Sequence, residues 1–106
     1  MGDAALLDRI QSLIAAPPAT RGGPTLDRIE DVLTEGYACA LALEAERWRL
    51  ERRLGEVAAE FAGGQQGRTE ELASIARRMA AADGDLVRLR AALASLRDRA
   101  SETRAA

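Results

Sequence analysis

The chain has 106 residues, one cysteine, no histidine and a formal net charge of -2, and charged residues of both signs make up 30% of its length. This length supports one domain at most, and the balanced charge gives no electrostatic reason to expect a nucleic acid or an anionic membrane as the main partner. Without histidine the chain lacks the commonest general base and metal ligand, and a single cysteine excludes an internal disulfide, so we expect no enzyme activity, cofactor, metal site or small-molecule substrate.

The hydrophobic residues predict a thin, all-α core. They make up 47% of the chain, but many are alanine, and the aromatic residues are only Tyr37, Trp48 and Phe61. A thick globular core needs more aromatic and large aliphatic volume than this. No apolar segment approaches the roughly 20 residues that span a bilayer, and the N-terminal apolar run carries Asp8 and Arg9 and has no basic start. We therefore expect a cytoplasmic protein.

The first predicted element is a short amphipathic helix within residues 1–16, which starts at about Asp3. Asp3 is expected to cap it, because a carboxylate oxygen accepts hydrogen bonds from the free N–H groups of a first turn. Pro17 and Pro18 end it, since the residue before a proline is disfavoured in the helical region. Residues 17–24 form a linker rich in proline and glycine. One face of the helix carries the large apolar residues Leu6, Ile10, Leu13 and Ile14.

The second predicted element is a long helix over about 26–62, capped by Thr25. Its apolar residues fall at alternating spacings of three and four, which is the heptad repeat of a left-handed coiled coil with core positions a and d. Gly63 is expected just past its C-terminal end. The a residues are Leu26, Leu33, Ala40, Arg47, Leu54 and Phe61, and the d residues are Ile29, Gly36, Leu43, Leu50 and Val57.

The third predicted element is a helix over about 70–104, capped by Thr69 and preceded by a loop at 63–69. A short glycine-rich loop between two long helices makes them antiparallel. Residues 25–104 are therefore predicted to form an antiparallel, coiled-coil-like helical hairpin. The core positions of this helix are Leu72, Ile75, Met79, Ala82, Leu86, Leu89, Leu93, Leu96, Ala100 and Thr103.

Two registers of the hairpin fit the loop, and charge favours one of them. With Phe61 level with Ile75, most flanking pairs are opposite in charge; with Val57 level with Leu72, most are alike. Each exposed pair contributes only about 0.2–0.5 kcal/mol, but the difference over the whole hairpin reaches about 2 kcal/mol. We therefore expect the first register, which places Gly36 opposite Ala100. Its attractive pairs are Glu60 with Arg78, Arg53 with Asp85, Glu44 with Arg90, and Glu30 with Arg104.

A second apolar stripe lies off the seam of core positions. Tyr37, Leu41 and Trp48 stand at spacings of four and seven, with Val32 nearby. An isolated hairpin would leave this stripe in water, and contiguous exposed apolar area usually marks a partner. Three covers fit it: the first helix folded back, a second copy of the chain forming a four-helix bundle, or a different protein. We predict Val32, Tyr37, Leu41 and Trp48 as partner-binding residues.

Two residues interrupt the seam and are predicted to set register and specificity. Arg47 is charged at an a position, where its stem can lie along the seam while the guanidinium reaches Glu44 or Glu51. Gly36, at a d position, costs up to about 1 kcal/mol against alanine but allows close backbone approach or leaves room for another side chain. Cys39, beside the seam, is expected to be a small apolar filler.

These features predict a non-enzymatic helical hairpin that acts as a protein–protein interaction, scaffold or adaptor module, either as a homodimer or with another helical protein. Two alternatives stay open. In form, the chain is similar to the small export chaperones of flagellar systems, which implies a chaperone-like export factor. The arginines around Trp48 suit a nucleic-acid-associated regulator, although glutamates at helical spacings offset them. These arginines are Arg47, Arg49, Arg52 and Arg53.

Overall fold

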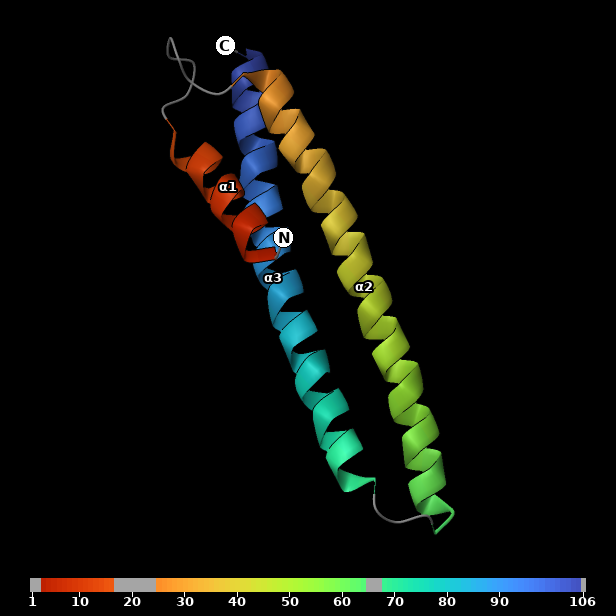
Figure 1. The fold of residues 1–106 in the computed structure, drawn as a ribbon. Helices are drawn as coiled ribbons and strands as arrows, with labels where there is room; N and C mark the ends of the chain where they lie inside the picture. The colour runs from red at the N-terminus through yellow and green to blue at the C-terminus, as the bar shows by residue number, and fades with distance from the viewer. Residues whose placement is uncertain (1–2, 17–24, 65–67, 106) are drawn as a thin grey trace. The chain divides into compact units, whose positions relative to one another are not determined.

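The computed structural model describes residues 3–16, 25–64 and 68–105, and all regular structure in them is α-helical. In chain order the helices are α1 (Asp3–Ala15), α2 (Leu26–Ala62) and α3 (Thr69–Ala105) (Figure 1). The predicted all-α class is confirmed; α2 has the expected bounds, and α3 is one residue longer at each end. The linker 17–24, the loop residues 65–67 and the side chain of Asp3 lie outside the described part, and so do the predictions made for them.

The helices are organised in two compact units. Unit 1 comprises Met1–Leu41 and Val87–Ala106, and unit 2 comprises Ala42–Leu86. Each unit therefore contains one stretch of α2 and one of α3, and within each unit the two stretches run antiparallel. Only unit 1 also contains α1.

The core of unit 1 is built by three helices, because α1 adds its apolar face to the α2–α3 pair. Leu6, Ile10 and Leu13 of α1 are buried, at the spacings of four and three that place them on one helix face. Burying such side chains contributes about 1.5–3 kcal/mol each. They pack with a core in α2 and α3 whose buried members are Ile29, Val32, Leu33, Ala40, Leu89, Ala92, Leu93, Leu96 and Ala100.

Two arginines fix α1 within unit 1. The guanidinium of Arg9 pairs with the carboxylate of Glu35 on α2 at 2.7 Å. Arg99 of α3 donates hydrogen bonds to the backbone carbonyl of Ile14 and, at 2.5 Å, to that of Ala16. The last carbonyls of a helix lack partners within the helix, and the last turn of α1 has no basic residue of its own. The α3 guanidinium therefore supplies the cationic cap at the C-terminus of α1.

The core of unit 2 is a two-helix seam. Leu50, Val57 and Ile75 are buried together, and Leu54, Leu72 and Met79 pack against them half-buried. These residues all stand at the predicted a and d positions, so the heptad repeat places them correctly. Phe61, also an a residue, lies outside this cluster and is exposed.

The predicted register of the α2–α3 pair is wrong. In unit 1 the residue opposite Gly36 is Leu93, not Ala100: a Cβ atom built on Gly36 would collide with Cδ2 of Leu93 and lie 3.4 Å from its Cγ. In unit 2 a single cluster joins Leu50, Leu54 and Val57 of α2 to Leu72, Ile75 and Met79 of α3, which is the set of residues that face one another in the register with Val57 level with Leu72. Each unit by itself therefore has the alternative register, one heptad from the one that charge favoured.

The charges do not select the predicted register, because arginine side chains reach past their level neighbours to carboxylates one heptad away. In unit 2, Arg53 pairs at 2.7 Å with Glu71, one heptad away from the level residue Arg78. Arg78 in turn reaches Glu46 at 3.0 Å. In unit 1 the expected pair of Glu30 with Arg104 is present at 2.8 Å, as another such diagonal contact. In the observed register most level pairs carry like charges, but the long arginine side chains form ion pairs with carboxylates on the diagonal.

The helix ends agree with the predicted caps only in part. The Arg28 backbone N–H donates to Thr25 Oγ1 at 3.2 Å, which confirms the cap of α2. After α2 the residue in the left-handed region is Gly64, with φ +93, and not Gly63. At α3 the first helical hydrogen bond runs from the Leu72 N–H to the Arg68 carbonyl, so Arg68 holds the cap position expected for Thr69.

Replacing Gly36 and replacing Gly55 by alanine should change the free energy of unfolding in opposite directions, because Leu93 approaches Gly36 closely and nothing approaches Gly55. Gly36→Ala gains helix propensity, about 1 kcal/mol, but forces Leu93 out of a packed core, which typically costs about 1–3 kcal/mol. We expect its free energy of unfolding to fall by about 1 kcal/mol. Gly55→Ala meets nothing within 4 Å and should raise it by up to about 1 kcal/mol. Urea unfolding followed by circular dichroism measures both, and a stabilising Gly36→Ala would contradict the register.

Candidate functional site

The two flanks of the α2–α3 pair in unit 1 differ in what covers them. The residues of α2 and α3 that bond to α1, Glu35 and Arg99, stand directly before core positions of the seam, and so do Arg88, Ala92 and Ser95, which line the hollow beside α1 with Ala91. Residues that directly follow core residues lie on the other flank of a helix pair. We call these sides the covered flank, which carries α1, and the open flank. The residues of the covered flank that lie at α1 are Glu35, Arg88, Ala92, Ser95 and Arg99.

The open flank of unit 1 carries large apolar side chains in water. Tyr37 and Leu41 of α2 are 42% and 67% exposed, and Val87 of α3 is 68% exposed. Each directly follows a core residue, and in the observed register Leu41 and Val87 lie at about the same level of the pair. Of the three covers that fit the stripe, the first helix folded over Tyr37 and Leu41 is therefore ruled out, because α1 occupies the opposite flank.

Charges on the open flank of unit 1 are separated by helix. In α2 the residues that follow core positions include two carboxylates and no arginine, whereas in α3 they include three arginines and no carboxylate. Glu30 and Arg104 join the two edges in an ion pair at 2.8 Å. The acidic edge of α2 consists of Asp27 and Glu30, and the basic edge of α3 consists of Arg90, Arg97 and Arg104.

In unit 2 the more exposed of the two exposed aromatic residues, Trp48 and Phe61, is Trp48. Its side chain is 59% exposed, and the Arg52 guanidinium lies over the ring at 5.2 Å from the centroid. Such a cation–π contact contributes about 0.5–1 kcal/mol at an exposed site. Trp48 directly follows the core position of Arg47, so it too stands off the seam. Its role in binding a partner stays a prediction.

The guanidinium of Arg47 reaches out of the apolar seam of unit 2, as expected for a charged residue at an a position. Its guanidinium pairs with Glu51 at 2.9 Å, as expected, and also with Asp83 of α3. The contact with Asp83 crosses from one helix to the other, so this core arginine links α2 and α3 through polar groups while its stem lies at the seam. Glu51 and Asp83 both follow core residues, which places the ionic cluster on the same flank as Trp48.

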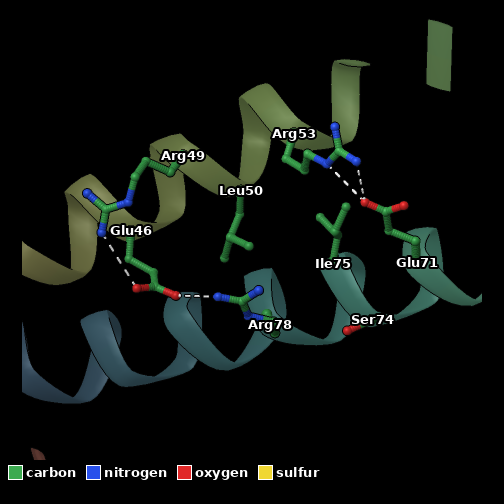
Figure 2. Close-up of a pocket in the computed structure, with 8 residues that line it drawn as sticks. All are labelled: Glu46, Arg49, Leu50, Arg53, Glu71, Ser74, Ile75 and Arg78. Carbon is green, nitrogen blue, oxygen red and sulfur yellow. Dashed lines mark hydrogen bonds and ion pairs between the residues drawn. The ribbon is translucent and has the colours of Figure 1, made fainter. Parts of the chain in front are cut away.

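The opposite flank of unit 2 holds a shallow depression of ≈ 350 Å³ (Figure 2). Figure 2 shows Leu50 and Ile75 between the two helices and the charged groups at the sides. Glu46 forms ion pairs with Arg49 at 3.6 Å and with Arg78 at 3.0 Å, and Glu71 forms one with Arg53. The arginines are thus satisfied by carboxylates of the chain itself. The lining residues are Glu46, Arg49, Leu50, Arg53, Glu71, Ser74, Ile75 and Arg78.

The ion pairs of these surfaces lower carboxyl pKa values in each unit. A hydrogen bond from Arg53 lowers the pKa of Glu71, assisted by the charges of Arg53 and Arg68. In unit 1 a hydrogen bond from Arg9 lowers the pKa of Glu35 and outweighs the opposing effect of desolvation. Both carboxylates therefore stay ionised below the usual range for glutamate.

The four predicted partner-binding residues do not form the single exposed stripe that the sequence predicts. Val32 is only 3% exposed and lies in the core of unit 1, so it takes no part in an exposed stripe. Tyr37 and Leu41 lie together on the open flank of unit 1, whereas Trp48 belongs to unit 2. Sequence reasoning missed Val87. Its signal was a β-branched apolar residue directly after the core residue Leu86, on a helix whose neighbouring exposed positions are mostly polar or alanine.

The described residues give no sign of other site chemistry. No group of three or more acidic or cysteine side chains among them is placed to hold a metal ion. None of the described helices is long and apolar enough to cross a membrane. No family model, curated protein or solved structure matches the chain. The candidate site is therefore the exposed surface of the helices, above all the open flank of unit 1.

Arg47 is expected to provide specificity and not stability. Replacing it by leucine fills the seam of unit 2 with apolar volume and removes two exposed ion pairs, which are worth little. We expect Arg47→Leu to raise the free energy of unfolding by about 1 kcal/mol. Arg49→Leu is the matched control, because Arg49 lies off the seam with 65% of its side chain exposed. Denaturant unfolding compares the two, and a clear loss of stability in Arg47→Leu would assign the ion pairs a structural role.

The pairing of Arg53 with Glu71 makes a prediction about pH. A carboxyl group with a lowered pKa stabilises the folded state above its ordinary value, and the contribution is lost as pH falls through the lowered pKa. Arg53→Met should raise the pKa of Glu71 toward its ordinary value, only partly, because Arg68 remains beside it. Carboxyl-detected NMR titration measures this shift. The pKa of Glu35 in unit 1 is the internal control and should not move.

Proposed function

We propose that this chain is a non-enzymatic helical protein-interaction module, which works as a scaffold or adaptor by binding another helical protein on the open flank of unit 1. The observation that carries the proposal is the exposure of Tyr37, Leu41 and Val87 on one flank. Scattered apolar residues are common on protein surfaces, but three large ones from two helices, at neighbouring positions of one flank, are typical of an interaction site.

The covered flank indicates what kind of partner the open flank suits. It is formed by the same two helices, and it holds a 13-residue amphipathic helix, α1. That helix buries apolar residues spaced by four and three and places a charged residue, Arg9, at the edge of the contact. The open flank likewise offers apolar residues between charged ones. A partner helix laid along it would be bound in the manner of a helix in a groove.

The charges of unit 2 support protein binding over the nucleic-acid alternative. The arginines around Trp48 would have to contact phosphates in that role. Arg47, Arg49 and Arg53 each pair with a glutamate instead, and Arg52 lies over the Trp48 ring. A phosphate backbone would have to displace these carboxylates and overcome their repulsion. The export-chaperone alternative is a special case of protein binding and is compatible with the same open flank.

The proposal is tested by photo-crosslinking in cells that make the chain naturally. A benzophenone amino acid at Leu41 should form an adduct of discrete mass with a protein, and Val87→Asp should reduce its yield by at least about tenfold, because a buried charge replaces an apolar contact.

The matched control places the same amino acid at Asp98, which is exposed on the outer face of α3 in unit 1 and follows no core residue directly. Position 98 should give no discrete adduct. Either a second copy or a different protein in the adduct from position 41 supports the proposal. The absence of any protein adduct from position 41, or equal adducts from both positions, contradicts it.

A further inference from the structure

We infer that the occupant of the open flank of unit 1 is the same flank of a second copy of this chain, set with α2 of each copy against α3 of the other. The inference rests on the proposed function and names its partner. Two independent properties of the flank, its charge and the sizes of its apolar side chains, require this arrangement.

Charge separates the two edges of the flank. The α2 edge carries Asp27 and Glu30 without an arginine, and the α3 edge carries Arg90, Arg97 and Arg104 without a carboxylate. Two copies stacked with α2 on α2 would bring like charges together at both edges. A two-fold axis parallel to the helices instead brings the acidic edge of each copy onto the basic edge of the other, and symmetry repeats the attraction twice.

The apolar middle of the flank is divided in the same way. The α2 side contributes the larger residues, Tyr37 and Leu41, and the α3 side contributes the smaller ones, Val87 and Ala94. Packing large side chains against small ones lets two helices interdigitate without voids. With α2 on α3 of the second copy, Leu41 lies over the region of Val87, since these two residues are at about the same level in the observed register. Charge and size therefore select one and the same arrangement.

Asp27 and Arg97 are the charges best suited to test it. Within the described part of the chain, neither forms an ion pair, so reversing their charge leaves the fold of one copy largely untouched. In the paired arrangement Asp27 faces the neighbourhood of Arg97 in the second copy. In a dimer of Asp27→Arg, the new arginine faces the neighbourhood of Arg97 of the second copy; in a dimer of Arg97→Asp, the new aspartate faces that of Asp27. Each variant then repels itself but attracts the other variant.

The experiment measures mass by light scattering and sedimentation equilibrium at low salt. The wild type should be a dimer. Asp27→Arg alone and Arg97→Asp alone should each dimerise about tenfold more weakly, and an equimolar mixture of the two should recover the dimer. Asp98→Arg and Arg77→Asp are matched controls, because they make the same charge changes at exposed outer positions. They should leave dimerisation unchanged, and circular dichroism should give the same helix content for all variants.

A double variant tests the apolar residues in the middle of the open flank. Leu41→Ala with Val87→Ala should weaken dimerisation by at least about a hundredfold, because each change occurs twice in the dimer. A monomeric wild type at all concentrations overturns the inference. So does a dimer that is insensitive to these changes, or a mixture of charge variants that recovers no dimer. A monomer that still crosslinks from position 41 to a different protein overturns the second copy as partner and leaves the proposed function standing.

Discussion

The contact that orders this molecule is the seam between α2 and α3, in which Leu93 packs against the bare backbone of Gly36 and Val57 stands level with Leu72. A side chain at residue 36 would compete for the space that Leu93 occupies. The glycine thus costs helix propensity but lets a buried leucine enter the seam, and burial of a large apolar side chain outweighs an exposed ion pair several-fold. This balance explains why the seam, and not the level charges, decides the register.

Once the seam is set, the residue next to each core position is assigned to one flank or the other. In unit 1 the residues before core positions contact α1. The ion pair of Arg9 and the hydrogen bonds from Arg99 to the last carbonyls of α1 hold that helix in place. The residues after core positions keep Tyr37, Leu41 and Val87 in water. One flank of this helix pair is therefore covered by α1 of the same chain, whereas the other flank leaves apolar side chains exposed. The proposed interaction follows from this difference between the two sides.

Much of the fold could be predicted from the sequence, because the heptad repeat, the prolines and the glycine-rich loop each determine local structure. The register could not, since a slip of one heptad keeps every core residue in the seam and changes only which core residues face one another, such as Leu93 and Gly36, and which charges pair. Diagonal charge partners, such as Glu71 for Arg53, depend on side-chain reach. The flank chosen by α1 was also hidden: Val32 and Tyr37 are both apolar, and only the packed structure buries the first and exposes the second. The exposure of Val87 follows from the same packing.

The register is tested most directly by cysteine pairs in unit 2, in a chain whose own Cys39 is replaced by alanine. Leu54→Cys with Ile75→Cys joins two residues of one seam layer, and Leu54→Cys with Ala82→Cys joins the layer that the slipped register would form. A disulfide requires Cα atoms within about 7 Å, so only facing residues close readily. The account predicts rapid, complete oxidation of the first pair and slow or no intramolecular oxidation of the second, measured by mass spectrometry. The reverse result would place α3 one heptad away along α2 in unit 2 and contradict the facing residues assigned to the seam of that unit.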